Sequence, residues 1–154
     1  PQLYYKDLLS LMYRKEDKSE NVMQNIAAAI TKLKMRQLYN GSIAMWDNCS
    51  QCENWWVSAY TAHFLVEAKN AGYKVDEDFL NTTLGYLKNK LKTKETITYY
   101  YMGNLKKKIA PKEVFYSLYV LALADQADIS LTNCNDDVRK ILTISNFEQL
   151  FTIQ

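Results

Sequence analysis

Residues 46–56 read "WDNCSQCENWW" and bring two cysteines and three tryptophans into eleven positions. Thiolates bind metals, exchange with disulfides and form thioesters, so Cys49 and Cys52 are the first candidates for chemistry. A further interpretation is structural, with the stretch forming a loop that leads into a buried helix. These interpretations make different demands on spacing and on the neighbouring elements.

A zinc site needs about four protein ligands. The sequence offers Cys49, Cys52, Cys134 and a single histidine, His63, which falls in the middle of an expected helix. A site built from all four would have no recognised ligand spacing. We therefore predict that the chain holds no metal and no other cofactor.

A redox Cys-x-x-Cys pair normally lies at a helix start, where the helix N-terminus lowers the thiol pKa. Cys52 precedes an expected helix, but no βαβ pattern surrounds it. We favour a structural loop, in which Cys49 and Cys52 either pair with each other in an oxidising compartment or stay free. Cys134 is expected to be a buried or partly buried free thiol.

Aromatic side chains gather in two places. Trp46, Trp55 and Trp56 flank the cysteine loop, and we predict that they clamp it by packing onto the start of the next helix. The alternative is an aromatic platform for sugar or protein ligands. The tyrosines at 99–101 are predicted to form a packing cluster between helices, with a ligand-contacting strip as the alternative.

Other residue types that support catalysis are present without a pattern that would combine them. His63 lies on an apolar helix and is expected to be a hydrogen-bonded core histidine, with a functional role as the alternative. The acidic residues mostly fall at helix ends, where capping and the helix dipole explain them. We predict no catalytic residue and no enzyme activity in this chain. The acidic residues in question are Glu67, Asp76, Glu77, Asp78, Asp136 and Asp137.

Length and composition fit one globular domain. The 154 residues are 48% hydrophobic and 23% charged, with a net charge of +2, which is too small to predict a nucleic acid partner. The longest nearly apolar run, residues 114–124, is too short to cross a bilayer. Because the chain begins inside a helical pattern, we expect residues 1–154 to be part of one domain of a larger protein, and missing targeting signals say nothing about location.

Apolar residues recur at helical spacing along most of the chain, which predicts an all-α protein. One stripe follows Ser19 and ends near Leu33, and Asn-Gly at 40–41 then predicts a turn. Residues 53–71 are apolar nearly all round, so this helix should be buried on most sides and end at Gly72. Further helices are expected around Leu8, from Asp76 through Leu91, from Pro111, over 136–142 and from residue 145.

The chain also repeats itself. "SAYTAHFLVEA" at 58–68 aligns with "SLYVLALADQA" at 117–127, and the offset of 59 keeps the serine, the tyrosine and the last alanine. Each copy is a mostly buried helix that a more polar one follows. Concentric rings of helical hairpins have this alternation, so we predict an α/α toroid, or a partial ring of inner and outer helices, with an irregular bundle as the alternative.

Four segments resemble the thioester domain of bacterial alpha-2-macroglobulin-like protease inhibitors. They are "PQLYYKDLL", "YNGSIAMW", "WWVSAYTAHFLVEAKNAGYKV" and "VFYSLYVLALADQADIS", in the family's order and over nearly the whole chain. The resemblance implies an α/α toroid of which this chain is about half or somewhat more. It implies a location in the periplasm or cell envelope, and a membrane link only through an anchor outside the chain.

The resemblance also implies a protease trap. A protease cleaves a bait segment elsewhere in the parent inhibitor, a thioester between cysteine and glutamine becomes exposed, and a lysine of the protease attacks it. The partners would be neighbouring domains and target proteases. Some thioester proteins use a histidine to steer acyl transfer, but no motif matches His63 to that role. The family's Cys-x-Glu-Gln motif lies shortly before the segment that resembles "PQLYY", so here it would precede Pro1.

Residues 49–52 do not replace this motif, because Cys52 and Trp55 stand three positions after the two cysteines, where glutamine is required. A different class of function is a thioester-free helical scaffold that binds an envelope protein or glycan. A third hypothesis is an enzyme built on an α/α toroid.

Overall fold

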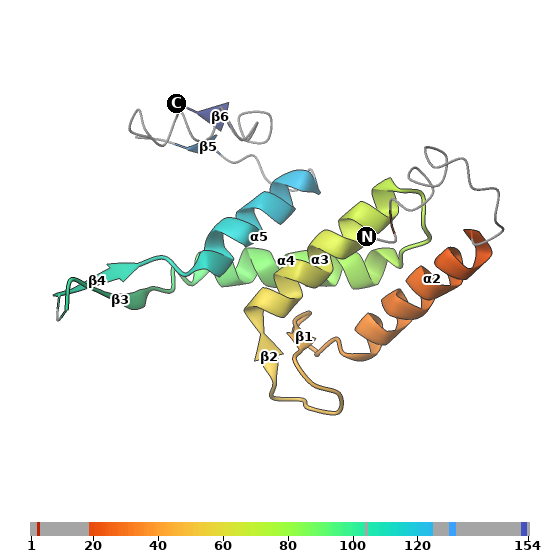
Figure 1. The fold of residues 1–154 in the computed structure, drawn as a ribbon, viewed down its shortest axis with the longest axis horizontal. Coiled ribbons are helices and arrows are strands. Elements are labelled where there is room, and N and C mark those ends of the chain that lie inside the picture. The colour runs from red at the N-terminus through yellow and green to blue at the C-terminus, as the bar shows by residue number, and fades with distance from the viewer. Residues whose placement is uncertain (1–2, 4–18, 104, 125–129, 132–151, 154) are drawn as a thin grey trace. The chain divides into compact units, whose positions relative to one another are not determined.

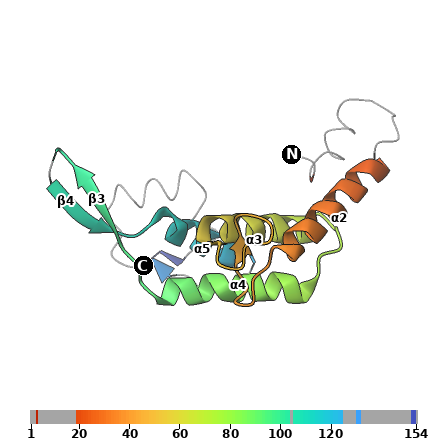
Figure 2. The same ribbon diagram turned by 90° about the horizontal axis from the view of Figure 1, so that it is seen from below.

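The computed structural model describes residues 3, 19–103, 105–124, 130–131 and 152–153. These residues form four α-helices and three two-stranded sheets, drawn in Figures 1 and 2. The sequence-predicted helices around Leu8, over 136–142 and from residue 145 lie outside the described residues, and so does Cys134. The helices are α2 (Ser19–Met35), α3 (Trp55–Asn70), α4 (Glu77–Lys92) and α5 (Lys112–Leu123).

The contacts divide the chain into two units, Pro1–Leu87 and Lys88–Gln154, with the division inside α4. The first unit holds α2, α3, most of α4 and the short strands β1 (Ile43–Ala44) and β2 (Glu53–Asn54). The second holds α5 and the remaining strands. That residues 1–154 belong to one domain stays a prediction.

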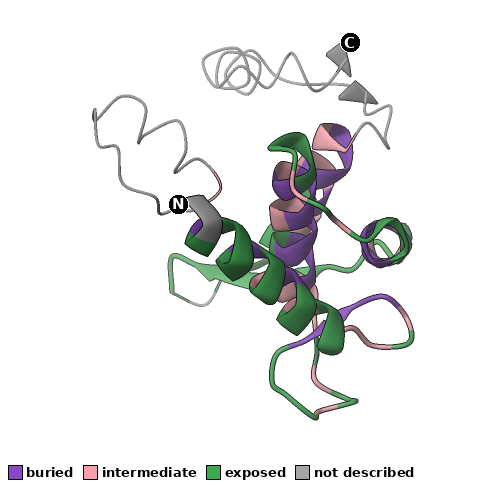
Figure 3. Ribbon diagram, turned by 90° about the vertical axis from the view of Figure 1, so that its right-hand side faces the viewer, coloured by how far each residue is buried: buried purple, intermediate pink, exposed green. Residues whose placement is uncertain are grey.

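Helix α2 confirms the first amphipathic stripe. Val22, Ile26 and Ile30 are buried at intervals of four residues, while most of the helix surface is exposed (Figure 3). Side chains four positions apart lie on one face of a helix, so this spacing gives α2 one buried face. The helix ends in a turn in which Arg36 and Gln37 donate their backbone N–H groups to the carbonyls of Leu33 and Lys34.

The predicted Asn-Gly turn follows α2 directly. Leu38 N–H donates to Ser42 O at 2.8 Å, and Gly41 N–H donates to Leu38 O at 2.9 Å. Gly41 has φ +85°, a left-handed conformation that favours glycine, and its α-carbon lies close to the Thr82 carbonyl of α4. A single β-bridge between Gln37 and Ile43 closes the turn. The chain thereby reverses and enters β1 beside the end of α2.

Helix α3 is the mostly buried helix that the sequence predicts. It begins after Asn54, whose side chain accepts a hydrogen bond from Val57 N–H, and it ends in a Schellman motif. In that motif Tyr73 N–H donates to Ala68 O and Gly72 N–H donates to Lys69 O, with Gly72 at φ +83°. The predicted stop at Gly72 is therefore confirmed. The buried side chains of α3 are Ser58, Ala59, Thr61, Ala62, Leu65, Val66 and Ala68.

Helix α4 returns beside α3 after a connection of six residues, as Figures 1 and 2 both show. Asp76 caps it by accepting Phe79 N–H at 2.8 Å. The predicted helix from Asp76 through Leu91 is confirmed, and its Leu80, Leu84 and Leu87 are at most 4% exposed, while Leu91 is half-buried. Phe79, Thr83 and Tyr86 are buried as well.

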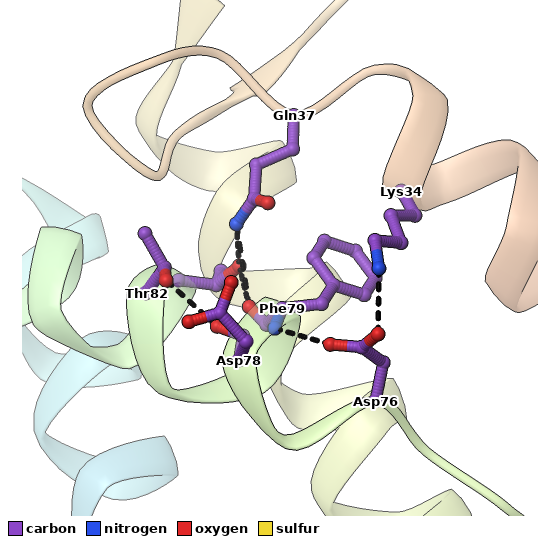
Figure 4. A network of polar contacts seen from close by, with 7 residues as sticks. Lys34, Gln37, Asp76, Asp78, Phe79 and Thr82 are labelled. Atoms are coloured by element: carbon purple, nitrogen blue, oxygen red, sulfur yellow. Dashed lines mark hydrogen bonds and ion pairs between the residues drawn. The ribbon is translucent and has the colours of Figure 1, made fainter.

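Polar contacts join the C-terminal end of α2 and the turn after it to α4 (Figure 4). Gln37 Nε2 donates to the Phe79 carbonyl at 3.3 Å and to Thr83 Oγ1 at 3.1 Å. Lys34 Nζ donates to Asp76 Oδ2 at 2.6 Å. This ammonium and the Phe79 N–H hold the pKa of the Asp76 carboxyl below its usual value.

The second unit contains a β-hairpin that the all-α prediction did not include. Strands β3 (Ile97–Tyr101) and β4 (Leu105–Ile109) pair antiparallel with Ile97 opposite Ile109 and Tyr101 opposite Leu105. The tyrosines at 99–101 lie on β3 and are exposed, so the predicted packing cluster between helices is wrong. β-branched and aromatic residues favour strands, and here that preference prevails.

Helix α5 follows the hairpin. Pro111 stands at its N-cap with φ −63° and ψ 152°, one residue before the predicted first-turn position, and Val114 N–H donates to the Pro111 carbonyl. Ser117, Val120 and Leu121 are buried in α5. The last strands, β5 (Ser130–Leu131) and β6 (Thr152–Ile153), pair in parallel. No helix among the described residues is long and apolar enough to span a membrane.

The sequence repeat has a counterpart in burial. Ser58 and Ser117, the first residues of the two aligned segments, are both 0% exposed, and the next aligned pairs of buried positions are Thr61 with Val120 and Ala62 with Leu121. Aromatic residues two positions before the serines are exposed in both helices. The fold is thus mostly helical, with a helix that carries several buried residues in each unit, while the toroid arrangement stays a prediction.

Gly41→Ala tests the close approach between the turn and α4. A Cβ at Gly41 would lie 2.3 Å from the Thr82 backbone oxygen, whereas one at Gly72, with nearly the same φ, would meet nothing within 4 Å. We expect Gly72→Ala to lower the free energy of unfolding by about 1 kcal/mol, the cost of the left-handed backbone. Gly41→Ala should cost about 2 kcal/mol more, because backbone must move. Equal losses in urea denaturation of the two variants would contradict the packing described.

Candidate functional site

The cysteine loop is held at its base by a short antiparallel pairing. Ile43 lies opposite Asn54 and Ala44 opposite Glu53, and Met45 N–H donates to the Cys52 carbonyl at 2.9 Å. Cys49 and Cys52 form a disulfide with a Cα–Cα distance of 5.3 Å. The disulfide closes a ring of four residues within a loop that β1 and β2 already anchor.

Ser58 joins this loop to α3. Its hydroxyl donates to the Asn54 carbonyl at 2.7 Å and accepts the Ile43 N–H at 2.8 Å. Ser58 and Ile43 are both 0% exposed, so the Ile43 N–H has no access to water and depends on this acceptor. One buried hydroxyl therefore connects β1, the residue that caps α3, and the first turn of α3.

The side chains of Asn40 and Glu53 also stabilise the loop, at its solvent-exposed side. Asn40 Oδ1 accepts hydrogen bonds from the Ser42 hydroxyl and backbone N–H, at 2.7 and 3.1 Å, and Asn40 Nδ2 donates to Glu53 Oε2. Tyr86 of α4 donates its hydroxyl to the other Glu53 oxygen at 2.7 Å. Glu53 thus connects the turn, β2 and α4 through one carboxylate.

The tryptophans only partly follow the prediction. Trp55 is half-buried, but Trp46 is 66% and Trp56 is 40% exposed. The predicted clamp of three packed indoles is therefore wrong for Trp46 and Trp56. Trp46 lies in the exposed stretch 45–48 beyond the paired strands, and Trp56 lies one turn before the exposed Tyr60 on the outer face of α3.

His63 lies on α3 with 27% of its side chain exposed, and its Nε2 is 3.9 Å from Glu67 Oε1. Burial lowers the pKa of the imidazole below 6.5. The carboxylate would favour the charged form, but 3.9 Å is longer than a hydrogen bond, so desolvation dominates. Burial therefore favours the neutral imidazole, and whether it has a functional role stays a hypothesis.

The sequence-predicted residues do not converge on one reactive centre. The disulfide occupies Cys49 and Cys52, and no group of three or more metal-binding side chains gathers within the part of the chain that the structure describes. The sequence analysis did not identify Asn40, Ser58 and Glu53, whose side chains connect several segments by hydrogen bonds. The repeat at offset 59 does include Ser58, so a buried serine shared by both copies was the available signal.

Comparison with known proteins shows that the chain is similar to an alpha-2-macroglobulin. It is 33% identical to the alpha-2-macroglobulin of Escherichia coli (strain K12) over 112 residues, which cover 73% of this chain and 6% of that protein. This similarity supports the family relation that the sequence motifs suggest, and it does not single out the thioester domain. The chain spans only a small part of this relative's length.

Other comparisons are less informative. A stretch of 29 residues is 69% identical to a STAS-domain containing protein of Pseudomonas aeruginosa (strain UCBPP-PA14), covering 19% of this chain and 29% of that protein. No family model matches the sequence. No solved structure matches it either.

The lowered pKa of His63 predicts a pH-dependent stability. Between that pKa and 6.5 the unfolded chain binds more protons than the folded one, so the free energy of unfolding should fall as the pH drops below about 6.5. Because the chain has one histidine, its imidazole C–H signals in an NMR titration need no assignment. The midpoint should lie below 6.5 in the folded protein and near 6.5 in urea. A folded midpoint at or above 6.5 would contradict the burial of this side chain.

Proposed function

We propose that this chain is part of the thioester domain of a bacterial alpha-2-macroglobulin-like endopeptidase inhibitor that traps proteases. The observation that carries the proposal is the 33% identity over 112 residues to the Escherichia coli protein. The buried helix α3, followed by the amphipathic α4, agrees with the inner and outer helices of an α/α toroid. The recurrence of a buried serine in α5 supports a repeated unit.

In this proposal the chain acts as a rigid frame. The reactive thioester would be formed by a Cys-x-Glu-Gln motif upstream of Pro1, and no catalytic residue is assigned to residues 1–154. When a protease cleaves the bait segment of the parent protein, a lysine amine of the protease attacks the thioester carbonyl. An amide bond forms, the bond to sulfur breaks, and the cysteine leaves as a thiol. The described helices would hold the motif in place before cleavage.

The proposed partners are the neighbouring domains of the inhibitor and the target proteases, with no nucleic acid. The proposed location is the periplasm or cell envelope. The disulfide between Cys49 and Cys52 supports an oxidising compartment, because disulfides persist there and are rare in the cytosol.

Methylamine treatment of the full-length protein that contains this chain tests the proposal. Methylamine should add once, raise the protein mass by one methylamine and release one thiol, and treated protein should no longer form covalent adducts with a protease. Alanine in place of the upstream cysteine is the matched control and should show no mass gain. If the unaltered protein also gains no mass, covalent trapping is wrong and a thioester-free scaffold that binds an envelope protein or glycan takes its place.

A further inference from the structure

The β3–β4 hairpin is exposed on both faces. Residues 97–103 and 105–108 are exposed along the whole hairpin (Figure 3), including the aromatic β3 residues Tyr99, Tyr100 and Tyr101. A two-stranded hairpin alone is marginally stable in water. In a stable sheet, at least one face is normally covered by another part of the protein or by a partner. The arrangement therefore indicates that this hairpin meets another surface.

Apolar side chains flank Gly103 and Asn104 at the tip of the hairpin, and its β4 strand is cationic. Met102 is 88% exposed, Leu105 54% and Tyr101 40%, and Lys106, Lys107 and Lys108 follow directly. The sequence from 96 to 112 has four lysines and no acidic residue. Within the described part of the chain, none of the three β4 lysines takes part in an ion pair. This charge is complementary to an anionic surface.

The strand register places the tyrosines and the lysines at matching levels. Tyr100 lies opposite Lys106 and Tyr99 opposite Lys107, while Tyr99 and Tyr101 stack on one face with ring centroids 6.4 Å apart. With a rise of about 3.4 Å per residue, the lysines lie within about 10 Å of Leu105 along the strand. An apolar tip below a band of tyrosine and lysine matches the depth profile of a membrane interface, where side chains reach about 5–10 Å into the headgroup boundary.

We propose that the β3–β4 hairpin docks on an anionic lipid bilayer, with Tyr101, Met102 and Leu105 inserted and Lys106–Lys108 at the lipid phosphates. Protein interfaces are enriched in tyrosine and methionine, but they are depleted in lysine. The three lysines therefore favour a bilayer over a protein partner. Lysine side chains instead extend their ammonium groups readily to lipid headgroups. This inference is independent of a thioester and concerns residues that the proposed trapping reaction does not use.

Sedimentation of the 154-residue chain with lipid vesicles tests the proposal. The chain should bind vesicles that contain phosphatidylglycerol and should not bind vesicles of phosphatidylcholine alone. Each lysine near an anionic surface strengthens binding by about a factor of five or more. The triple variant K106E/K107E/K108E should therefore bind at least about 100-fold more weakly. Binding should also weaken as salt is added.

A matched control separates the hairpin from net charge. K32E/K74E/K92E changes three exposed lysines outside the hairpin, and each exchange lowers the charge by two, so both triple variants go from +2 to −4. The control should keep most of the binding, and far-UV circular dichroism should show that both variants are folded. An equal loss in both would mean that overall charge drives binding and would overturn the proposal.

The double variant M102S/L105S tests insertion. Binding to anionic vesicles should fall at least about 10-fold, because two exposed apolar side chains no longer leave water. Unchanged binding would mean a purely electrostatic contact and would overturn insertion. Failure of the unaltered chain to bind anionic vesicles, or equal binding to neutral ones, would overturn the proposal as a whole. None of these results depends on methylamine reactivity.

Discussion

The first unit depends on a hydrogen bond that a buried backbone N–H cannot do without. Ile43 leads the chain into β1 with its amide shielded from water, and the Ser58 hydroxyl accepts it while donating to the carbonyl of Asn54. A buried donor without a partner costs about 1–3 kcal/mol, so the position of Ser58 in α3 fixes where β1 can lie. The turn at Gly41 and the disulfide loop both extend from that fixed point.

These contacts fix the position of α3 within the first unit. Its cap, its buried serine and its Schellman end are all defined by contacts with the segments before and after it. The similarity to an alpha-2-macroglobulin extends over most of the chain, and a helix shielded on most sides is compatible with the frame role that we propose for it. The exposed hairpin between α4 and α5 differs in character: it offers charge and apolar side chains to a second surface.

Sequence reasoning succeeded where one physical signal dominated. Helical spacing located α2, α3 and α4, and the glycine at 72 located a helix end, because these features depend on neighbours in the chain. It failed for the tyrosines at 99–101, because a strand of an exposed hairpin and a packing cluster between helices can have the same composition. It also failed for Trp46 and Trp56, since a residue type predicts burial only on average. The choice of Ser58 as a buried acceptor depends on the tertiary position of Ile43, which local spacing does not encode.

Hydrogen exchange at the Ile43 amide in Ser58→Ala, measured by NMR beside the unaltered chain, tests this account most directly. Thr31→Ala is the matched control, because Thr31 is exposed and its hydroxyl only donates to the Ala27 carbonyl of its own helix. In Ser58→Ala the Ile43 amide should lose protection and the free energy of unfolding should fall by about 1–3 kcal/mol, while the control changes neither. Full protection of Ile43 in folded Ser58→Ala would contradict the claim that this hydroxyl holds β1 on α3.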